Sequence, residues 1–272
     1  MLVSLLVGCN LIGANSEPVP PALLGEPLKT HYLIDQHYDL DRENLFATMG
    51  HLLVFNPGSS NADLKITLYF EKDPPQSFSL KAAAKTSTES NYKSWPIKPK
   101  LNSVFAIKVE STESVICQTT IGWTNTNNDY HPSAKTKSPK GIRETAKSYM
   151  SINQLSQDWY VADGIIIDLP EKLWIRESEW AIVLNPGLQD AQVTLLMYYG
   201  KKTIQKKFTV PAQRMQRIFM DDLAERNKHY GTRIISDHPI AAQWLRTVNW
   251  YDSPELMATW SVPAVPNFSA KQ

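Results

Sequence analysis

Leu53-Val54-Phe55-Asn56-Pro57-Gly58 returns later in the chain as Ile182-Val183-Leu184-Asn185-Pro186-Gly187. In both places an apolar run meets the turn signal Asn-Pro-Gly, and a second apolar run ending in tyrosine follows. Matching residues here are 129 positions apart (185 − 56 = 129). The stretch therefore marks a repeated unit.

Two further matches extend the repeat in both directions. Residues 31–36 match 159–164 at a spacing of 128 (159 − 31), and residues 115–118 match 240–243 at a spacing of 125 (240 − 115). Solenoid repeats are much shorter, at roughly 20 to 50 residues. The sequence therefore predicts two tandem domains, each long enough to bury its own core.

The second copy shows strand patterns almost throughout. Short runs rich in β-branched and aromatic residues alternate with turn signals, which predicts an all-β fold of two tandem jelly-roll-like β-sandwich domains. The runs lie at 159–162, 180–184, 192–199, 204–210, 214–219, 232–236, 239–248 and 257–262. Helical candidates are residues 221–227 and 141–155, and the polar stretch 81–100 predicts an irregular loop. The expected boundaries are a signal-like segment and tether (1–28), a divergent first copy (29–127), a linker (128–158) and the second copy (159–264).

The N-terminus carries a possible export signal. Leu6-Val7-Gly8-Cys9 resembles a bacterial lipobox, and the preceding apolar run is shorter than the about 20 residues of a membrane span. No Lys or Arg precedes Cys9, so an ordinary buried strand is the alternative. We expect lipidation at Cys9, export to the periplasm or cell surface, and membrane contact only through that lipid.

Charge and motifs narrow the function. A net charge of +1 argues against a nucleic-acid partner. The sequence contains no phosphate-binding loop, zinc-protease motif or nucleophile elbow, so we expect no enzyme activity, no cofactor and no metal site. Two carboxylates could serve a glycosidase, such as Asp163 with Glu179 or Asp221 with Asp222, but nothing marks out a pair.

An ordered set of residues in the second copy carries a family resemblance. The set comprises Trp159-Tyr160-Val161-Ala162-Asp163-Gly164, Asn185 with Gly187, Val210-Pro211-Ala212-Gln213-Arg214, and Pro239-Ile240-Ala241-Ala242-Gln243 with Arg246. It resembles the soluble sensory rhodopsin transducer family over about 159–262. The resemblance implies a small jelly-roll-like sandwich, often oligomeric, that binds small sugar-related molecules without catalysis. Because this chain is duplicated and has an export-like start, the photoreceptor role is not carried over.

The candidate ligand site lies in the second copy, which holds six of the eight tryptophans. Aromatic rings stack on the flat faces of sugars, and arginine donates to acidic sugars, carboxylates or phosphates through a fixed fork. The alternative is that the tryptophans are core and the arginines form a solvated or inter-subunit face. The predicted ligand-binding residues are Asp163, Arg214, Gln243, Trp244, Arg246 and Trp250.

The first copy lacks these arginines. Thr88 or Glu89 falls near the Arg214 position and Ile121 stands opposite Arg246, although Gln118 matches Gln243. We therefore expect a non-catalytic small-molecule or carbohydrate-binding protein of the bacterial cell envelope. Its second copy binds the ligand, and its first copy is a scaffold that makes an internal pseudo-dimer. The alternative to the internal pseudo-dimer is a homo-oligomer, in which separate copies of the chain associate. The alternative is a structural or protein-interaction module that assembles with another envelope protein.

Overall fold

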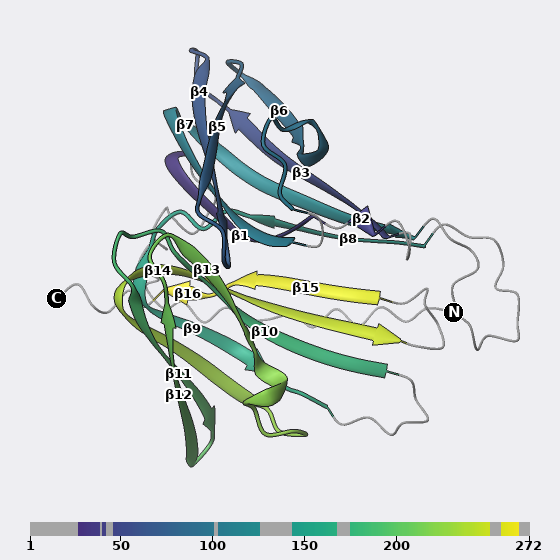
Figure 1. Cartoon of the computed structure of the whole chain (residues 1–272), viewed down its shortest axis with the longest axis vertical. Coiled ribbons are helices and arrows are strands. Elements are labelled where there is room, and N and C mark those ends of the chain that lie inside the picture. Colours follow the sequence, from purple (N-terminus) through teal and green to yellow (C-terminus); the bar gives the residue numbers. More distant parts are fainter. Residues whose placement is uncertain are drawn as a thin grey trace, which may run out of the picture.

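The computed structural model describes residues 27–38, 40–41, 46–100, 103–125, 143–167, 175–250 and 257–266, which form mainly antiparallel strands (Figure 1). The strands fall into two groups of eight. Domain 1 contains β1 to β8 and domain 2 contains β9 to β16. The all-β prediction of two sandwich-like domains is confirmed.

Domain 1 is built around one long strand that takes part in two sheets. The first half of β7 pairs with β1 and β4, and β5 extends β4; we call this sheet A. The second half of β7 pairs with β3 and β8, and β2 and β6 extend β3; we call this sheet B. The bounds are β1 Leu28–Tyr38, β2 Leu40–Asp41, β3 Phe46–Asn56, β4 Ala62–Phe70, β5 Gln76–Ala82, β6 Thr86–Asn91, β7 Ser103–Asn125 and β8 Arg143–Met150.

Domain 2 repeats this plan. The first half of β14 pairs with β9 and β11, with β16 beside β9 and β12 beside β11, which forms sheet C. Its second half pairs with β10 and β15, with β13 beside β10, which forms sheet D. The bounds are β9 Ser156–Gly164, β10 Ile175–Asn185, β11 Ala191–Tyr199, β12 Lys202–Val210, β13 Arg214–Phe219, β14 Tyr230–Trp250, β15 Met257–Pro263 and β16 Val265–Pro266.

The pairing register is the same in both domains once the offsets of the repeat are applied. Leu53 of β3 pairs with Gln118 of β7, and Ile182 of β10 pairs with Gln243 of β14. These partners differ by 129 and 125 positions, as the sequence matches do. Sheet A therefore corresponds to sheet C, and sheet B to sheet D.

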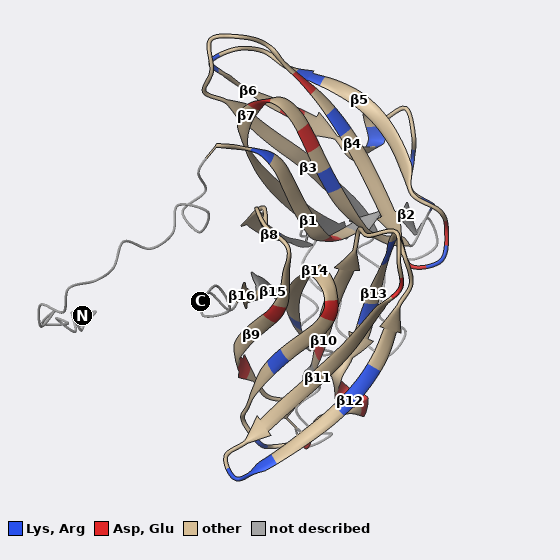
Figure 2. Ribbon diagram, turned by 90° about the vertical axis from the view of Figure 1, so that its left-hand side faces the viewer, with Lys and Arg blue, Asp and Glu red and all other residues tan. Residues whose placement is uncertain are grey.

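Each sandwich buries the inward side of alternating strands. In β11, Val193, Leu195 and Met197 are buried between more exposed neighbours, as expected for a strand with one face on a core. Domain 1 packs its own cluster around Trp95 and Phe105. Charges of both signs are spread over the strands of both domains (Figure 2).

The repeated Asn-Pro-Gly motif fixes the turn after β3 and after β10. The buried side-chain amide of Asn185 donates to the backbone oxygens of Gln189 (2.8 Å) and Val210 (3.0 Å), and its oxygen accepts from the N–H of Gly187 (3.0 Å). Asn56 makes the matching bonds in domain 1. The motif therefore has a structural role in both domains.

The two domains pack against each other through apolar sheet faces. Residues of the outer face of sheet A, including Tyr32, Ile34 and Tyr69, share one hydrophobic cluster with Ile182 and Leu184 of sheet D. Strand β1 contacts β10 and β14, β4 contacts β13, and β8 contacts β15, as the stacked domains in Figure 1 show. The domains thus have a common core as well as separate ones.

A two-point ion pair crosses the same boundary. Arg217 of β13 donates from Nε and Nη2 to the carboxylate of Glu71, each at 3.0 Å. Glu71 lies just after β4. The contact between the domains therefore has a polar edge beside its apolar centre.

Four local expectations differ from the structure. Residues 143–150, in the expected linker, form strand β8 and not part of a helix, because Lys147 and Tyr149 are buried in alternation and β8 pairs along the edge of sheet B. The stretch 81–100 contains β6 and a 3-10 turn (Tyr92–Ser94). Of the expected helix 221–227, only a 3-10 turn (Met220–Asp222) forms. The runs 232–236 and 239–248 join in one strand, β14.

Among the described residues, no helix has the length and apolar character needed to cross a bilayer.

Candidate functional site

A β-bulge lies at the same place in both domains. From residue 33 to residue 36 of β1 the chain advances three residues, while the paired strand β7 advances only two. The same mismatch occurs between residues 161 and 164 of β9 and its partner β14. A bulge of this kind redirects side chains and leaves a residue unpaired. Asp35 and Asp163 lie inside these bulges at equivalent positions (163 − 35 = 128).

In domain 2 the bulge lies beside a buried carboxylate. Glu179 of β10 is fully buried and accepts hydrogen bonds from Arg246 Nε (2.7 Å), the N–H of Ile165 (3.1 Å) and the hydroxyl of Tyr230 (2.5 Å). Arg246 also reaches Asp163 through Nη1 at 3.3 Å. Burial first, and then the charge of Glu179, raise the pKa of Tyr230 far above its usual value, so this phenol stays a hydrogen-bond donor.

Neighbouring groups hold this carboxylate in place. Asp221 accepts the hydroxyl of Ser178 (3.0 Å) and the backbone N–H of Glu179 (3.0 Å). Gly164 makes room for the Tyr230 ring, because a Cβ at that position would lie 2.5 Å from it. The site is therefore built from strands β9, β10 and β14 together.

Domain 1 closes the equivalent position. Asp35 forms an ion pair with Lys147 of β8. The side chain of Asp35 is 0 % exposed and that of Lys147 is 4 % exposed, whereas Asp163 is 70 % exposed. Burial lowers the pKa of Lys147, and the charge of Asp35 opposes that shift. The bulge carboxylate is thus covered in domain 1 and open to solvent in domain 2.

The Glu179–Arg246 pair has no counterpart in domain 1. Gly50 pairs with Ile121 in the register where Glu179 pairs with Arg246. The ring of Tyr92 fills the space, since a Cβ on Gly50 would lie 2.1 Å from it. The sequence predicted that domain 1 lacks this arginine. In the structure, the ring of Tyr92 occupies the space beside Gly50.

A hydrogen-bond network completes the closed position. Gln36 accepts from the hydroxyls of Tyr92 and Thr119 (2.9 Å to Thr119) and donates to the hydroxyl of Tyr149 (2.5 Å). Burial raises the pKa of both tyrosines. These groups are satisfied within domain 1 and form part of its core.

The structure brings two of the predicted ligand residues together, namely Asp163 and Arg246. Trp244 lies on the same face of β14 as Arg246, as the period of two predicts. It is buried, with its ring edge-on to Tyr230 at 6.2 Å. Asp163, at 70 % exposure, therefore forms the solvent-facing part of the site, whereas the side chain of Arg246 is only 19 % exposed and Trp244 is buried.

The other predicted residues lie elsewhere. Gln243 is buried on the opposite face of β14 and hydrogen-bonds to Tyr149 of domain 1. Arg214 begins β13 and donates to the backbone oxygen of Gln213 (2.9 Å). Its counterpart in domain 1 is Thr86, which pairs with Asn56, and not the expected Thr88 or Glu89. The side chain of Trp250, and Cys9, lie outside the described residues.

Sequence reasoning missed Tyr230 and the bulge. Glu179 was considered only as half of a carboxylate pair. It follows the polar residues 176–178, so no signal in the sequence marked this glutamate as buried. In the structure its two oxygens accept hydrogen bonds from Arg246, from the N–H of Ile165 and from Tyr230. In the part of the chain that the structure describes, no three His, Cys, Asp or Glu residues are grouped to hold a metal.

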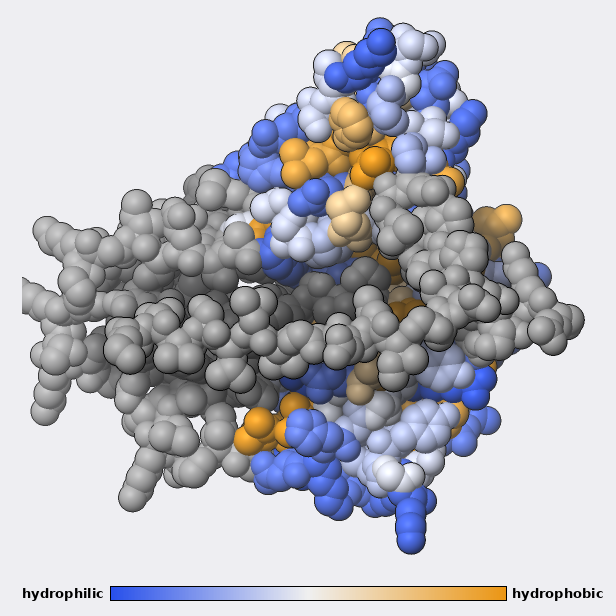
Figure 3. All heavy atoms as spheres, turned by 180° about the vertical axis from the view of Figure 1, so that it is seen from behind, coloured by the Kyte–Doolittle hydropathy of each residue, from blue (hydrophilic) through white to orange (hydrophobic). Residues whose placement is uncertain are grey.

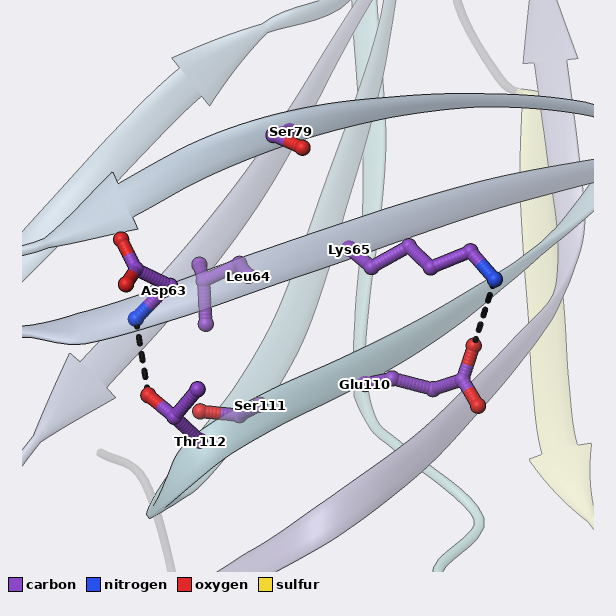
Figure 4. Close-up of a pocket in the computed structure, with 7 residues that line it drawn as sticks. All are labelled: Asp63, Leu64, Lys65, Ser79, Glu110, Ser111 and Thr112. Atoms are coloured by element: carbon purple, nitrogen blue, oxygen red, sulfur yellow. Dashed lines mark hydrogen bonds and ion pairs between the residues drawn. The ribbon is translucent and has the colours of Figure 1, made fainter.

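An open depression of about 330 Å³ lies on domain 1, away from this site (Figure 4). An ion pair between Lys65 and Glu110 (3.7 Å) and a hydrogen bond from the N–H of Asp63 to Thr112 (3.0 Å) cross it. Its lining residues are Asp63, Leu64, Lys65, Ser79, Glu110, Ser111 and Thr112. None of the predicted ligand residues contributes to it.

Comparisons with known proteins agree with the resemblance seen in domain 2. Residues 155–263 match the family described as Anabaena sensory rhodopsin transducer. The solved Anabaena sensory rhodopsin transducer is 26% identical, with a TM-score of 0.31, and the match covers 33% of this chain and 85% of that one. The crystal structure of Thermotoga maritima 1070 is 16% identical, with a TM-score of 0.36, and covers 41% of this chain and 95% of that one.

A third solved structure, the exo-chitosanase CsxA of Amycolatopsis orientalis, is 10% identical with a TM-score of 0.20, and covers 90% of this chain and 26% of that one. No curated protein matches the chain. The family match spans nearly all of domain 2, from the start of β9 to the end of β15. Domain 2 is therefore similar in sequence to the sensory rhodopsin transducer family, and domain 1 repeats the strand order of domain 2.

Proposed function

We propose that the protein is a non-catalytic binding module in which domain 2 recognises a small polar ligand of the carbohydrate class through Asp163 and Arg246. One observation supports this proposal above the others. The bulge carboxylate is 70 % exposed in domain 2 and 0 % exposed at the equivalent Asp35 of domain 1. Domain 1 then serves as the scaffold.

The chemistry of the two residues suits a ligand with hydroxyl or carboxylate groups. Arg246 is held by buried Glu179, so little side-chain entropy is lost when a ligand contacts its guanidinium. Asp163 lies at the end of a 3.3 Å contact and can accept a ligand hydroxyl. In this proposal Trp244 supports Tyr230 from below, and Gln243 belongs to the contact between the domains.

The test is a ligand screen on the full chain with a matched pair of variants. Neutral sugars, uronic acids and sugar phosphates are screened by thermal shift and confirmed by calorimetry. At about 100 times its Kd, a ligand that binds only the folded state adds about 2.7 kcal/mol of stability. Asp163→Asn is expected to weaken binding about tenfold, in keeping with the loss of one charged hydrogen bond.

Asp63→Asn is the control, because Asp63 has the same 70 % exposure and also ends a long ion pair, to Lys81 at 3.6 Å. It lies on domain 1 and is expected to leave binding unchanged. The proposal fails if no compound in the panel shifts the melting temperature, or if the two variants bind alike.

A protein partner is the second candidate, favoured by exposed tyrosines on sheet C. Tyr160 and Tyr198 lie on the outer face of that sheet, and tyrosine is enriched at protein interfaces. The family that domain 2 matches is described as a transducer of a sensory rhodopsin, and this description supports a role in binding another protein. For this chain the partner would be another envelope protein.

We also propose export and lipid attachment at Cys9, supported by the lipobox-like Leu6-Val7-Gly8-Cys9. The full chain produced in a bacterial host is labelled with a radioactive fatty acid and fractionated. The chain is expected in the membrane fraction with label, and Cys9→Ala is expected in the soluble fraction without it. Absence of label from the unaltered chain would remove this part of the proposal.

A further inference from the structure

A lysine and an aspartate from the two sheets of domain 1 meet inside its core. Lys147 Nζ contacts Oδ2 of Asp35, and the two side chains are 4 % and 0 % exposed. Asp35 lies on β1 of sheet A and Lys147 on β8 of sheet B. Charged side chains are almost never buried to this extent unless they are paired. Hydrophilic residues dominate the described surface in the view of Figure 3, so the buried pair departs from the usual placement of charge.

The surroundings of the pair are apolar or aromatic. Ile121, the cross-strand neighbour of Lys147 on β7, is fully buried, and the ring of Tyr149 has its centroid 5.8 Å from Lys147 Nζ. The hydroxyl of Tyr149 donates to the backbone oxygen of Asp35 at 2.7 Å, which fixes the strand that carries the carboxylate. Removing two full charges from water costs free energy that their attraction only partly offsets. A reaction that turns the pair into a neutral group would remove that cost.

Burial also favours the reactive form of the lysine. It lowers the pKa of Lys147, although the charge of Asp35 opposes that shift. An uncharged amine has a lone pair with which to attack a carboxyl carbon, whereas an ammonium group has none. The contact with Oδ2 holds this nitrogen beside the carboxyl group of Asp35. Reacting groups held in such proximity have a very high effective concentration, and the exclusion of water protects a condensation product from hydrolysis.

The position of the pair in the fold suits a covalent link. β1 is the first strand of domain 1 and β8 is the last, and 112 positions separate the two residues (147 − 35 = 112). A link that closes a long loop restricts the unfolded chain strongly. The chain has two cysteines, and Cys117 is a buried free thiol. No disulfide therefore supplies such a link within the described part of domain 1.

Domain 2 lacks this combination of contact and burial. Asp163, the equivalent of Asp35, is 70 % exposed, and its cation is Arg246, whose guanidinium keeps its proton in proteins. Lys202 and Glu225 are also in direct contact, but their side chains are 61 % and 22 % exposed. Among the lysine–carboxylate pairs of the described residues, the pair in domain 1 is therefore the one with both partners buried.

We propose that Lys147 and Asp35 condense to an isopeptide bond that joins sheets A and B of domain 1. One proton of the ammonium group passes to the carboxylate, which leaves an amine and a carboxylic acid. Nζ then attacks Cγ, so that the Nζ–Cγ bond forms and one Cγ–Oδ bond breaks. The departing hydroxyl takes a second proton from the nitrogen and leaves as water, and the third proton stays on the new amide. The reaction needs no oxidant, reductant or second substrate.

Mass spectrometry of the denatured full chain tests the proposal. The unaltered chain is expected to be lighter by one water than its amino-acid sequence requires. Lys147→Arg keeps the positive charge but does not form the amide, so it is expected to have the full mass of its own sequence. Comparing the two chains cancels any processing at the N-terminus, because both would carry it. Lys147→Met replaces the arginine variant if that variant does not fold.

Tryptic digestion locates the bond and needs only the unaltered chain. The bond is expected to block cleavage after Lys147 and to join residues 30–42 to residues 144–172 in one branched peptide. Lys202 is the internal control, because it contacts Glu225 at an exposed position and is expected to be cleaved normally. A lighter fraction that grows while the folded chain is incubated would support the proposal as well.

Three results would overturn the proposal. The first is a chain mass equal to that of the sequence after prolonged incubation of the folded protein. The second is normal cleavage after Lys147 with no branched peptide. The third is a loss of water that maps to another part of the chain. None of these readouts depends on the ligand site, because the pair lies in domain 1 and Asp163 and Arg246 lie in domain 2.

Discussion

At the scale of single residues, Asn185 shows why the repeated motif persists. Its amide satisfies the backbone oxygens of Gln189 and Val210 and the N–H of Gly187, and Asn56 does the same in domain 1. Removing it leaves buried backbone groups without partners, which costs about 1 to 3 kcal/mol for such a set. We expect Asn185→Ala to lower the free energy of unfolding by about 2 to 3 kcal/mol in urea titrations.

The comparison for this prediction is Asn61→Ala. Asn61 accepts only the N–H of Ala84 at an exposed position, so its loss is expected to cost under about 1 kcal/mol. Equal effects of the two variants would show that the turn does not depend on the Asn185 amide.

Arg246 has a second role that affects its use as a probe. It is the cation beside fully buried Glu179, and removing one partner of a buried ion pair typically costs about 3 to 5 kcal/mol. We expect Arg246→Ala to be destabilised by about that amount, and the double variant with Glu179→Gln to recover part of it. A loss below about 1 kcal/mol in chemical denaturation would contradict the pair's structural role. For ligand tests, Asp163→Asn is therefore the better variant.

At the scale of elements, the bulge in β9 depends on a glycine. A Cβ at Gly164 would lie 2.5 Å from the Tyr230 ring, so Gly164→Ala must displace the ring that donates to Glu179. Overpacking of this kind typically costs about 1 to 3 kcal/mol. We expect Gly164→Ala to lose stability in that range in thermal and urea unfolding. Gly231→Ala on the adjacent strand is the matched change, since its Cβ would meet nothing nearer than 3.8 Å, and a similar loss there would argue against the clash.

The elements also show what the sequence could and could not predict. Period-two alternation and turn signals predicted the strands of domain 2 and placed Gln243 on the face opposite to Trp244 and Arg246. Strand β8 was missed because its Arg, Glu, Thr, Lys and Ser residues do not form an apolar pattern, and its pairing with β7 is long-range. The bulge was missed for a related reason, since a bulge is a mismatch between two strands and is not a property of either one.

At the scale of the molecule, burial depends on what the domains pack against. Tyr32 and Tyr160 are identical residues at equivalent positions, yet one is covered and the other is exposed. The sequence established that there are two copies, but it could not show which of four outer sheet faces meet. The sequence could not separate two roles for Gln243, because a conspicuous polar residue on a strand can face a ligand or a neighbouring domain.

The contact between the domains is expected to depend on pH. Burial has the largest influence on Glu71 and would raise its pKa, but the hydrogen bonds and charge of Arg217 together bring it below the usual value of 4.5. A lowered pKa means that the ion pair contributes its full stability above about pH 4.5 and loses it as pH falls through the lower folded-state value. Because both side chains are about a third exposed, the contribution is at most about 1 kcal/mol.

We therefore expect the unfolding free energy of Glu71→Gln to lie about 1 kcal/mol or less below that of the unaltered chain at pH 7, with the gap closing toward pH 3. Asp63→Asn, which removes a carboxylate far from Arg217, supplies the comparison at each pH. A gap for Glu71→Gln that stays constant from pH 7 to pH 3 would mean that the carboxylate does not act through its charge. In that case the domains would be held together by contacts that do not titrate in this range, namely the shared apolar cluster around Tyr32 and Ile182 and the hydrogen bond between Gln243 and Tyr149.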